Sequence, residues 1–474
     1  MYKNSLLAAI SGITILCANT SYGAENISFS SGKSGALSVP ADDAPAELTD
    51  EEIAKRFNVF YQTTFIGHSK PGMSELYSGP NSMQARYETG YTWTNSAHIG
   101  WKIAPRTEAF LNVEAVSGVP FSNLQGLGGF ANGEATRAQG PDLKFYRQRA
   151  FIRHTENFSG EQSKLTEEAN QFPMLVAANR LVITAGNFAL LDVMDDNEFA
   201  KDPRTQFLNW GNFTHASFDY AADARGYGWG IAFEWYKENW AYRFARMTVP
   251  RTPNELVVDS QFFAHYGDNI EIERGHVIHD QPGKVRLLAY RDRQIMSRFD
   301  DALALIQTNP NLIGSQTILN SRYGEQVKMG VGINIEQHLT KNIGVYFRGM
   351  ISDGQTETLA FTEADNSIST GLSFNGALWK KPTDTFGISF LQNGLSDARK
   401  SYLAAGGVSF FIGDTAGPGQ TLNYAPERIL ETYYSWGVYK NVWLTANYQH
   451  INNPAYNADR GPANFFGVRF HAEY

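Results

Sequence analysis

The sequence predicts an all-β fold, a transmembrane antiparallel β-barrel of about 16 strands, with 18 as the alternative count. Segments of about ten residues alternate between apolar and polar side chains and are separated by turn residues, as barrel strands are. Mean hydropathy is negative, at -0.34, although aromatic residues make up 13% of the chain and glycines number 43. A barrel accommodates this composition because only alternate strand residues face lipid.

The last nine residues show the alternation most clearly. One face carries only apolar side chains, namely Phe466, Val468, Phe470, Ala472 and Tyr474. Polar or small residues occupy the other face, which is the pattern of a strand between lipid and water. An aromatic last residue on the apolar face is typical of the closing strand of bacterial outer-membrane barrels. Tyr474 is therefore expected to be part of the signal that the barrel-assembly machinery binds.

Deleting Tyr474 is expected to lower the amount of folded barrel in the outer membrane without changing secretion, because the deletion removes only the assembly signal. The measurement is the amount of protein with heat-modifiable gel mobility. A normal amount of this form in the deletion variant would contradict the prediction.

The N-terminus has the three parts of a cleaved secretory signal, which we place at residues 1–24. Lys3 gives a positive start, residues 6–17 form a short apolar segment, and residues 21–24 include small side chains before the cut. Cys17 is the only cysteine, so the mature chain is expected to have no disulfide and no thiolate metal site. Together with the C-terminal strand, this signal predicts location in the outer membrane of a Gram-negative bacterium.

Residues 25–57 differ from the rest of the chain. Residues 26–43 are rich in Ser, Gly and Ala and are expected to form a flexible leader. Thr49 and Glu52 make a capping-box pattern, which predicts a short periplasmic helix from about Asp50. This segment is either a solvated start to the barrel or a periplasmic plug or strut. Residues 58–474 are expected to form the barrel.

Strands and inserts alternate along the barrel region. Alternating segments are expected at 83–94, 98–103, 109–115, 181–185, 285–289, 343–347, 386–390 and 442–449. The Gly-rich residues 119–142 and the polar residues 155–172 are expected to be inserts outside strands. Apolar residues at helical spacing predict short helices at 298–307 and 395–405. Long loops of this kind lie on the extracellular side of barrels and can narrow the pore.

Arginines on the polar strand faces are the candidate pore residues. Arg147, Arg149 and Arg153 share parity and should point together into the lumen, opposite in direction to Ala150 and Ile152. The same test places Arg86, Arg348 and Arg469 on polar faces. A charge on the lipid face costs about 2–4 kcal/mol at the bilayer midplane, which favours the inward direction. Each arginine either selects solutes or braces the wall by pairing with a carboxylate such as Glu88 or Glu114.

No motif supports catalysis, a cofactor or a metal. Residues 32–34 and 126–131 resemble parts of nucleotide-binding loops but lack the required glycine or the following helix. There is no HExxH or GxSxG motif. A formal charge of -8 is unlike that of a nucleic-acid binder. The Arg, Glu, Asn, Gln, Tyr and Trp of the polar faces suit a neutral sugar, which needs planar donors, carboxylate acceptors and aromatic faces.

Seven segments of the chain carry a recognisable pattern, namely residues 77–82, 126–134, 179–188, 195–197, 202–210, 219–230 and 467–471. In these segments the chain resembles the carbohydrate-selective porin family (OprB type) of Gram-negative outer membranes. It implies a sixteen-stranded, monomeric barrel that passes glucose-like or other sugars by diffusion through an arginine-lined eyelet. Asp202, Arg204 and Asn209 are either a hydrogen-bonded set that locks a loop or part of a sugar site. Residues 223–226 have the composition of a turn.

The leading hypothesis is a passive, carbohydrate-selective outer-membrane porin with lipid and sugar as partners. The pore-lining candidates are Arg86, Glu114, Arg147, Arg149, Arg204, Asn209, Arg348 and Arg469. Three alternatives remain open: a general or anion-leaning porin, an enzyme scaffolded by the barrel, and a soluble secreted lectin. Conductance with added sugars, hydrolytic assays and detergent extraction respectively distinguish them.

Overall fold

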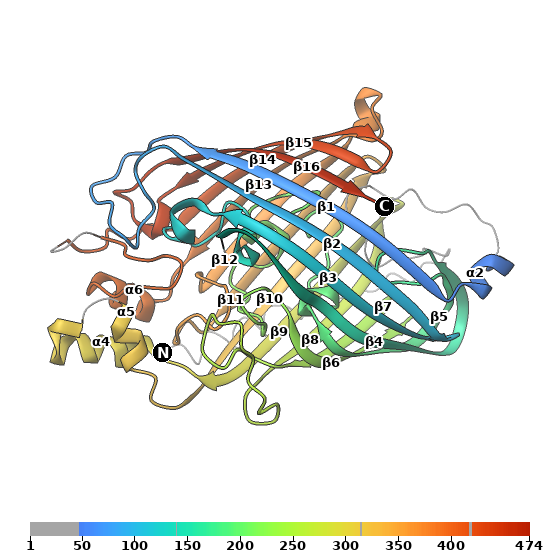
Figure 1. The fold of residues 1–474 in the computed structure, drawn as a ribbon, viewed down its shortest axis with the longest axis horizontal. Helices are drawn as coiled ribbons and strands as arrows, with labels where there is room; N and C mark the ends of the chain where they lie inside the picture. Colours follow the sequence, from blue (N-terminus) through green and yellow to red (C-terminus); the bar gives the residue numbers. More distant parts are fainter. Residues whose placement is uncertain (1–46, 139, 313–314, 417–419) are drawn as a thin grey trace.

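The computed structural model describes residues 47–138, 140–312, 315–416 and 420–474. Within them, sixteen strands close into one antiparallel barrel in which each strand pairs with its neighbours in sequence (Figure 1). The expected count of about 16 is confirmed, and the alternative of 18 is wrong. The expected signal peptide and the leader up to residue 46 lie outside the described residues.

The strands are β1 (Phe57–Lys70), β2 (Glu88–Ala104), β3 (Thr107–Val119), β4 (Gly140–Leu165), β5 (Met174–Phe188), β6 (Gly228–Lys237), β7 (Trp240–Met247), β8 (Tyr266–Ile278), β9 (Gln281–Ile295), β10 (Glu325–Thr340), β11 (Ile343–Ser352), β12 (Asn366–Asn375), β13 (Thr385–Gly394), β14 (Glu427–Tyr439), β15 (Val442–Asn452) and β16 (Ala463–Glu473). The α-helices are α2 (Asp50–Ala54), α3 (Trp210–Phe213), α4 (Phe299–Thr308), α5 (Ser315–Asn320) and α6 (Asp397–Ala404). Short 3-10 helices are η2 (Phe121–Leu124), η3 (Ala135–Arg137), η4 (Leu190–Asp192), η5 (Pro310–Leu312), η6 (Gly376–Trp379) and η7 (Pro454–Tyr456).

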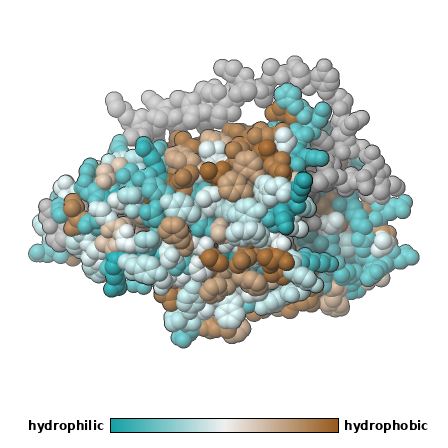
Figure 2. Space-filling view, turned by 90° about the horizontal axis from the view of Figure 1, so that it is seen from above, coloured by the Kyte–Doolittle hydropathy of each residue, from teal (hydrophilic) through white to brown (hydrophobic). Residues whose placement is uncertain are grey.

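Alternation along the strands places apolar side chains outside the barrel. Ile99, Trp101 and Ile103 of β2 are exposed, whereas Lys102 between them is buried. Figure 2 shows the result on one face, where apolar residues gather over the middle of the wall and hydrophilic residues lie toward both ends. An apolar band between two polar ends is the surface that a bilayer requires of a barrel.

The terminal strands close the barrel. β1 pairs with β16 from Gln62↔Glu473 to Ser69↔Phe466, and Tyr61 exchanges two backbone hydrogen bonds with Tyr474. Along β16, Phe470 is exposed on the outer face and Arg469 is buried on the inner face, as the alternation predicts. The role of Tyr474 in assembly stays a prediction.

The two ends of the barrel differ in their connections. One end, which we call the turn end, carries the short connections such as 105–106, 238–239 and 341–342. The other, the loop end, carries the long ones, including 120–139, 189–227, 296–324 and 395–426. Helices α4, α5 and α6 gather at the loop end, at the left of Figure 1, and α2 lies at the turn end. The helices expected at 298–307 and 395–405 are confirmed as α4 and α6.

Helix α2 begins at the expected capping box. The Thr49 hydroxyl accepts a hydrogen bond from the Glu52 amide, and the Glu52 carboxylate accepts one from the Thr49 amide. Ion pairs of Lys164 with Glu52 (2.7 Å) and of Lys55 with Glu167 (2.6 Å) hold the helix against the β4–β5 hairpin. No helix among the described residues is both long and apolar enough to cross a bilayer.

Two strand boundaries differ from expectation. Residues 83–87 belong to the connection between β1 and β2, so the strand begins at Glu88 and Arg86 is an exposed loop residue outside the wall. Residues 155–165 were expected to be an insert but continue β4, which pairs with β5 down to Leu165↔Met174. In this stretch β4 extends past its pairing with β3, which ends at Thr107↔His154, and its sequence lacks the apolar alternation of the other strands.

A β-bulge in β4 separates Arg147 from Arg149. Arg149 lies opposite Asn112 and Arg147 opposite Val113, so two steps along β4 match one step along β3. Asn112 is buried on the inner face and Val113 is exposed on the outer face. The expectation that both arginines share one face is therefore wrong: Arg149 points inward and Arg147 outward. One extra residue, Gln148, inverts the parity.

Candidate functional site

The long connection between β5 and β6, residues 189–227, enters the barrel, and we call it the inserted loop. Most of residues 193–222 are buried, although connecting segments usually lie on protein surfaces. Its short helix α3 is capped by Asn209, whose side-chain oxygen accepts from the Gly211 amide (3.0 Å). Aromatic contacts of Trp210 with Phe130 and Phe361 join the inserted loop to two other loops.

Arg348 of β11 holds the start and the middle of the inserted loop. Its guanidinium donates to a carboxylate oxygen of Asp195 (3.0 Å) and to the carbonyls of Ala200 and Asn212 (both 2.7 Å). Burial alone would raise the pKa of Asp195, but the adjacent Arg348 outweighs burial and lowers it. With its donors directed at the loop backbone, Arg348 braces the loop.

Arg469 and Asn209 hold the same loop against the other side of the wall. Arg469 of β16 donates to the carbonyls of Pro203 and Gln206 (both 2.8 Å). The Asn209 amide group donates to the Gly129 carbonyl (3.2 Å) and to Gln449 (3.0 Å), and its backbone N–H donates to Glu431 (3.1 Å). Both side chains are therefore occupied by protein groups.

Arg204 links the inserted loop to β3 and to the loop 120–139. Its guanidinium contacts Glu114 at 2.7 Å and Glu134 at 2.9 Å. Burial alone would lower the pKa of Arg204, but the two carboxylates raise it further than burial lowers it. Glu114 also accepts from Ser96 (2.7 Å) and from Tyr146. The exposed fraction of the Arg204 side chain is 7% and that of Glu114 is 0%, so neither presents a surface to a solute.

A second set of inward side chains is accessible to solvent. Arg149 donates twice to Asp192 of the inserted loop, both at 2.7 Å, and the two side chains are 15% and 26% exposed. Arg137 pairs with Glu134 at 2.7 Å and is 22% exposed. Tyr227 lies beside both arginines, with its ring centre 5.6 Å from the Arg137 guanidinium carbon and 5.2 Å from that of Arg149. Tyr227 itself is buried, at 2% exposed, so it backs the two arginines and is not open to solvent. We call Arg137, Arg149 and Asp192, together with the Tyr227 ring behind them, the accessible cluster.

The accessible cluster and its surroundings are balanced in charge. Arg137, Arg149 and Arg204 face three carboxylates, those of Glu114, Glu134 and Asp192. Burial alone would raise the pKa of Asp192, but Arg149 beside it lowers the pKa instead. Planar guanidinium donors beside carboxylate acceptors can bind hydroxyl groups without attracting ions of one sign.

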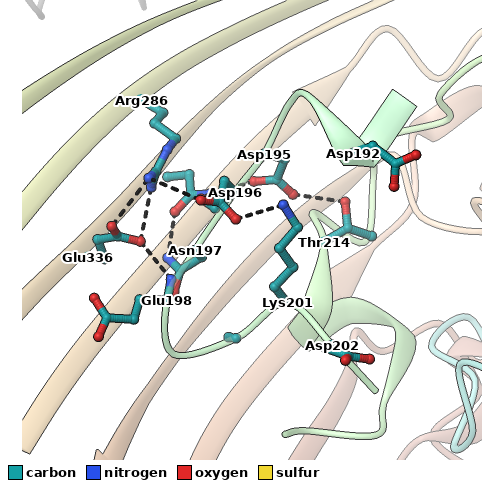
Figure 3. A network of polar contacts seen from close by, with 12 residues as sticks. Asp192, Asp195, Asp196, Asn197, Glu198, Lys201, Asp202, Thr214, Arg286 and Glu336 are labelled. Atoms are coloured by element: carbon teal, nitrogen blue, oxygen red, sulfur yellow. Dashed lines mark hydrogen bonds and ion pairs between the residues drawn. The ribbon is translucent and has the colours of Figure 1, made fainter. Parts of the chain in front are cut away.

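A further ion-pair network lies along the inserted loop, a few residues after Asp192 in the chain (Figure 3). Asp196 is placed between Lys201, at 2.6 Å, and Arg286, at 4.0 Å, and Arg286 also contacts Glu336 at 3.1 Å. Burial alone would raise the pKa of Asp196, but Lys201 and Arg286 together lower it. Lys201 is 30% exposed and Arg286 is fully buried, so only the Lys201–Asp196 part can meet a solute.

The sequence-predicted candidates therefore divide into separate groups. Arg204, Asn209, Arg348, Arg469 and Glu114 form buried contacts, Arg149 lies in the accessible cluster, and Arg86 and Arg147 lie outside the lumen. Sequence reasoning missed Arg137, Asp192 and Tyr227. Tyr227 directly follows a segment that was interpreted as a turn, and Arg137 lies in a Gly-rich insert, so strand parity could find neither.

Among the described residues, no group of three or more His, Cys, Asp or Glu side chains is arranged to hold a metal ion. The combination of a closed sixteen-stranded barrel, an apolar outer band and loops folded into the lumen defines the class of porin-like outer-membrane channels.

The comparisons with known proteins agree with this class. The model of the family "Carbohydrate-selective porin, OprB family" matches residues 117–474. This chain therefore belongs to the carbohydrate-selective porin family. No curated protein matches the sequence.

Solved structures share the fold. The high-pH structure of Pseudomonas putida OprB superposes with a TM-score of 0.63 at 16% identity, covering 90% of this chain and 96% of that one. The low-pH structure of the same protein gives a TM-score of 0.48 at 11% identity, with 90% and 94% covered. The channel DcaP of Acinetobacter baumannii gives 0.48 at 7% identity, with 91% and 100% covered. At these sequence identities the similarity shows a shared fold only. The evidence for the shared fold is the first superposition, with its TM-score of 0.63.

Proposed function

We propose that this protein is a passive channel through which sugars diffuse across the outer membrane, and that the accessible cluster is its arginine-lined constriction. The single observation that carries the proposal is the Arg149–Asp192 pair. It joins the barrel wall to the inserted loop inside the lumen and remains partly exposed. Family membership supports carbohydrate as the solute.

The chemistry of the cluster favours neutral sugars over ions. Each accessible arginine is paired with a carboxylate, so the cluster offers donors and acceptors side by side with little net field. The guanidinium fork presents several N–H donors in one plane, which lysine does not. This balance argues against the alternative of an anion-leaning porin. The family and the fold indicate a channel and not a barrel-scaffolded enzyme, and the closed barrel with its apolar band does not fit a soluble lectin.

Replacing Arg149 by Gln together with Asp192 by Asn is expected to lower the affinity with which sugars block the ion current by about tenfold. The reason is that hydrogen bonds to charged groups contribute about 1.5–3 kcal/mol and those to neutral amides less. Both replacements keep the size and polarity of the side chains, so the barrel should still assemble. The measurement is single-channel current in a planar bilayer while glucose or maltose is added.

A matched control is the Arg106–Glu156 pair at the turn end, 2.9 Å apart and almost half exposed. Replacing both of its residues by Gln should leave sugar block unchanged. Sugar block that survives in the Arg149→Gln/Asp192→Asn channel would remove the accessible cluster from the pathway. A strong anion preference of the wild-type current in a salt gradient, without competition by sugars, would favour the general porin instead.

A further inference from the structure

Four arginines at the loop end of β4, β7 and β9 point out of the barrel. They are Arg147, Arg246, Arg291 and Arg293, which we call the outer arginine belt. In the strand register, Asp268 of β8 lies opposite Arg246 of β7 on one side and opposite Arg291 of β9 on the other. The three residues therefore lie in one row across three strands. The residues flanking them along the chain, Met247 and Asp292 among others, are fully buried on the inner face. Alternation therefore places the arginines outside.

The belt lies at the edge of the apolar band that is nearer to the loop end. Phe244 and Ile270 are cross-strand partners that lie two residues from Arg246 and Asp268, toward the turn end, and on the same outer face. Both are exposed apolar residues. A charge on the lipid face costs about 2–4 kcal/mol at the midplane and about 0–1 kcal/mol near the interface. The arginines are therefore positioned where the acyl chains end and the headgroups begin.

Aromatic residues contact three of these guanidinium groups. The Arg147 guanidinium carbon lies 4.9 Å from the ring centre of Trp229, and that of Arg246 lies 4.0 Å from the ring centre of Tyr266. Arg291 contacts the same tyrosine, with its guanidinium donating to the Tyr266 hydroxyl at 2.7 Å. Tyr and Trp at this level form the interfacial girdle of a barrel. Each guanidinium group has five N–H donors, so a ring contact or a single bond to a hydroxyl leaves most of them open to a ligand.

The belt carries more positive than negative charge. Asp268 pairs with Arg246 at 2.7 Å, and Glu325 contacts Arg293. Arg147 and Arg291 are exposed, and neither forms an ion pair with any described residue. Four arginines against two carboxylates leave two positive charges at the headgroup level. Unpaired arginine in that position is suited to a phosphate, which the guanidinium fork can bind with two parallel hydrogen bonds.

We propose that the outer arginine belt binds the phosphate groups of a phosphorylated glycolipid in the outer leaflet, with Arg147 and Arg291 as its main contacts. Lipid chains of the same molecule cover the apolar residues below the belt. The site lies on the outside of the wall, so it does not depend on which solute passes through the lumen. It also explains why β4 places an arginine on the outer face next to one on the inner face.

The test is a lipid titration of the purified barrel in detergent, followed by native mass spectrometry. The probe is diphosphoryl lipid A, compared with the same lipid after removal of its phosphates and with inorganic phosphate alone. The wild-type protein should bind the phosphorylated lipid at least tenfold more tightly than the dephosphorylated one. Replacing Arg147 and Arg291 by Gln should abolish that difference.

Arg274 provides a matched control. It is an exposed outward arginine of β8 whose guanidinium carbon lies 5.2 Å from the ring centre of Trp240, but it lies at the turn end. Arg274→Gln should bind the phosphorylated lipid like the wild type. Equal weakening by Arg274→Gln, unchanged binding by Arg147→Gln/Arg291→Gln, or binding of inorganic phosphate in place of the lipid would each overturn the proposal.

Heat-modifiable gel mobility shows whether each variant is folded. If the double variant does not fold, Arg147→Gln and Arg291→Gln are titrated singly. Each is expected to weaken phosphorylated-lipid binding about threefold or more, and single variants that bind like the wild type would equally overturn the proposal.

Discussion

Replacing Arg348 by Ala is expected to release the inserted loop from the wall and to lower the free energy of unfolding by about 3–5 kcal/mol. This is the cost of leaving one partner of a buried ion pair without its countercharge. Asp195 is fully buried beside Arg348, and the carbonyls of Ala200 and Asn212 lose their donors as well. The β10–β11–β12 ladder does not involve this side chain, so the barrel should still close.

Two measurements check this expectation. The temperature at which the folded gel band is lost should fall, and the ion conductance in a planar bilayer should rise because the loop no longer fills the lumen. The variant Arg348→Met/Asp195→Asn should recover part of the stability, since it removes both charges together. Wild-type conductance and unaltered melting in Arg348→Ala would show that the inserted loop is held without this contact.

Replacing Arg204 by Ala is expected to have an effect of similar size, about 3–5 kcal/mol, because the buried Glu114 loses the cation paired with it and Glu134 keeps only Arg137. Glu114 and Glu134 are 0% and 1% exposed and meet at the Arg204 guanidinium. Arg204→Lys should rescue only partly, since an ammonium group cannot present the same fork to both carboxylates. Thermal unfolding in detergent measures both variants.

A double-mutant cycle with Glu114→Gln tests whether Arg204 acts through this carboxylate. The two substitutions together should cost less than the sum of the single costs, because the residues are in direct contact. Strict additivity, with each single variant destabilised, would assign the effect of Arg204 to other partners such as Ser96.

Most strands and the short helices could be predicted from local sequence. Alternation is imposed by lipid on one side and polar groups on the other, so β16 and the outer residues of β2 could be read directly from residue type. The capping box of α2 and the apolar spacing of α4 are equally local. Along β4 beyond residue 155, where the strand pairs with β5 and no longer with β3, this alternation is missing, so residue type does not predict a strand there.

The contacts of the lumen could not be derived in the same way. Arg348 lies 153 residues from Asp195 along the chain, and Arg469 lies 266 residues from Pro203. Strand parity places such an arginine inside the barrel but says nothing about which loop it meets. The division between buried, loop-holding arginines and accessible ones depends on how the inserted loop packs, and no local pattern encodes that packing.

The bulge at Gln148 also shows what one added residue does to a barrel strand. The strand keeps its alternation on each side of the bulge, but residues two positions apart across the bulge point to opposite faces. In β4 this places Arg147 on the outer face and Arg149 on the inner face. Inserting or deleting one residue in a strand can therefore exchange the inner and outer faces on one side of the change and leave the other side as it was.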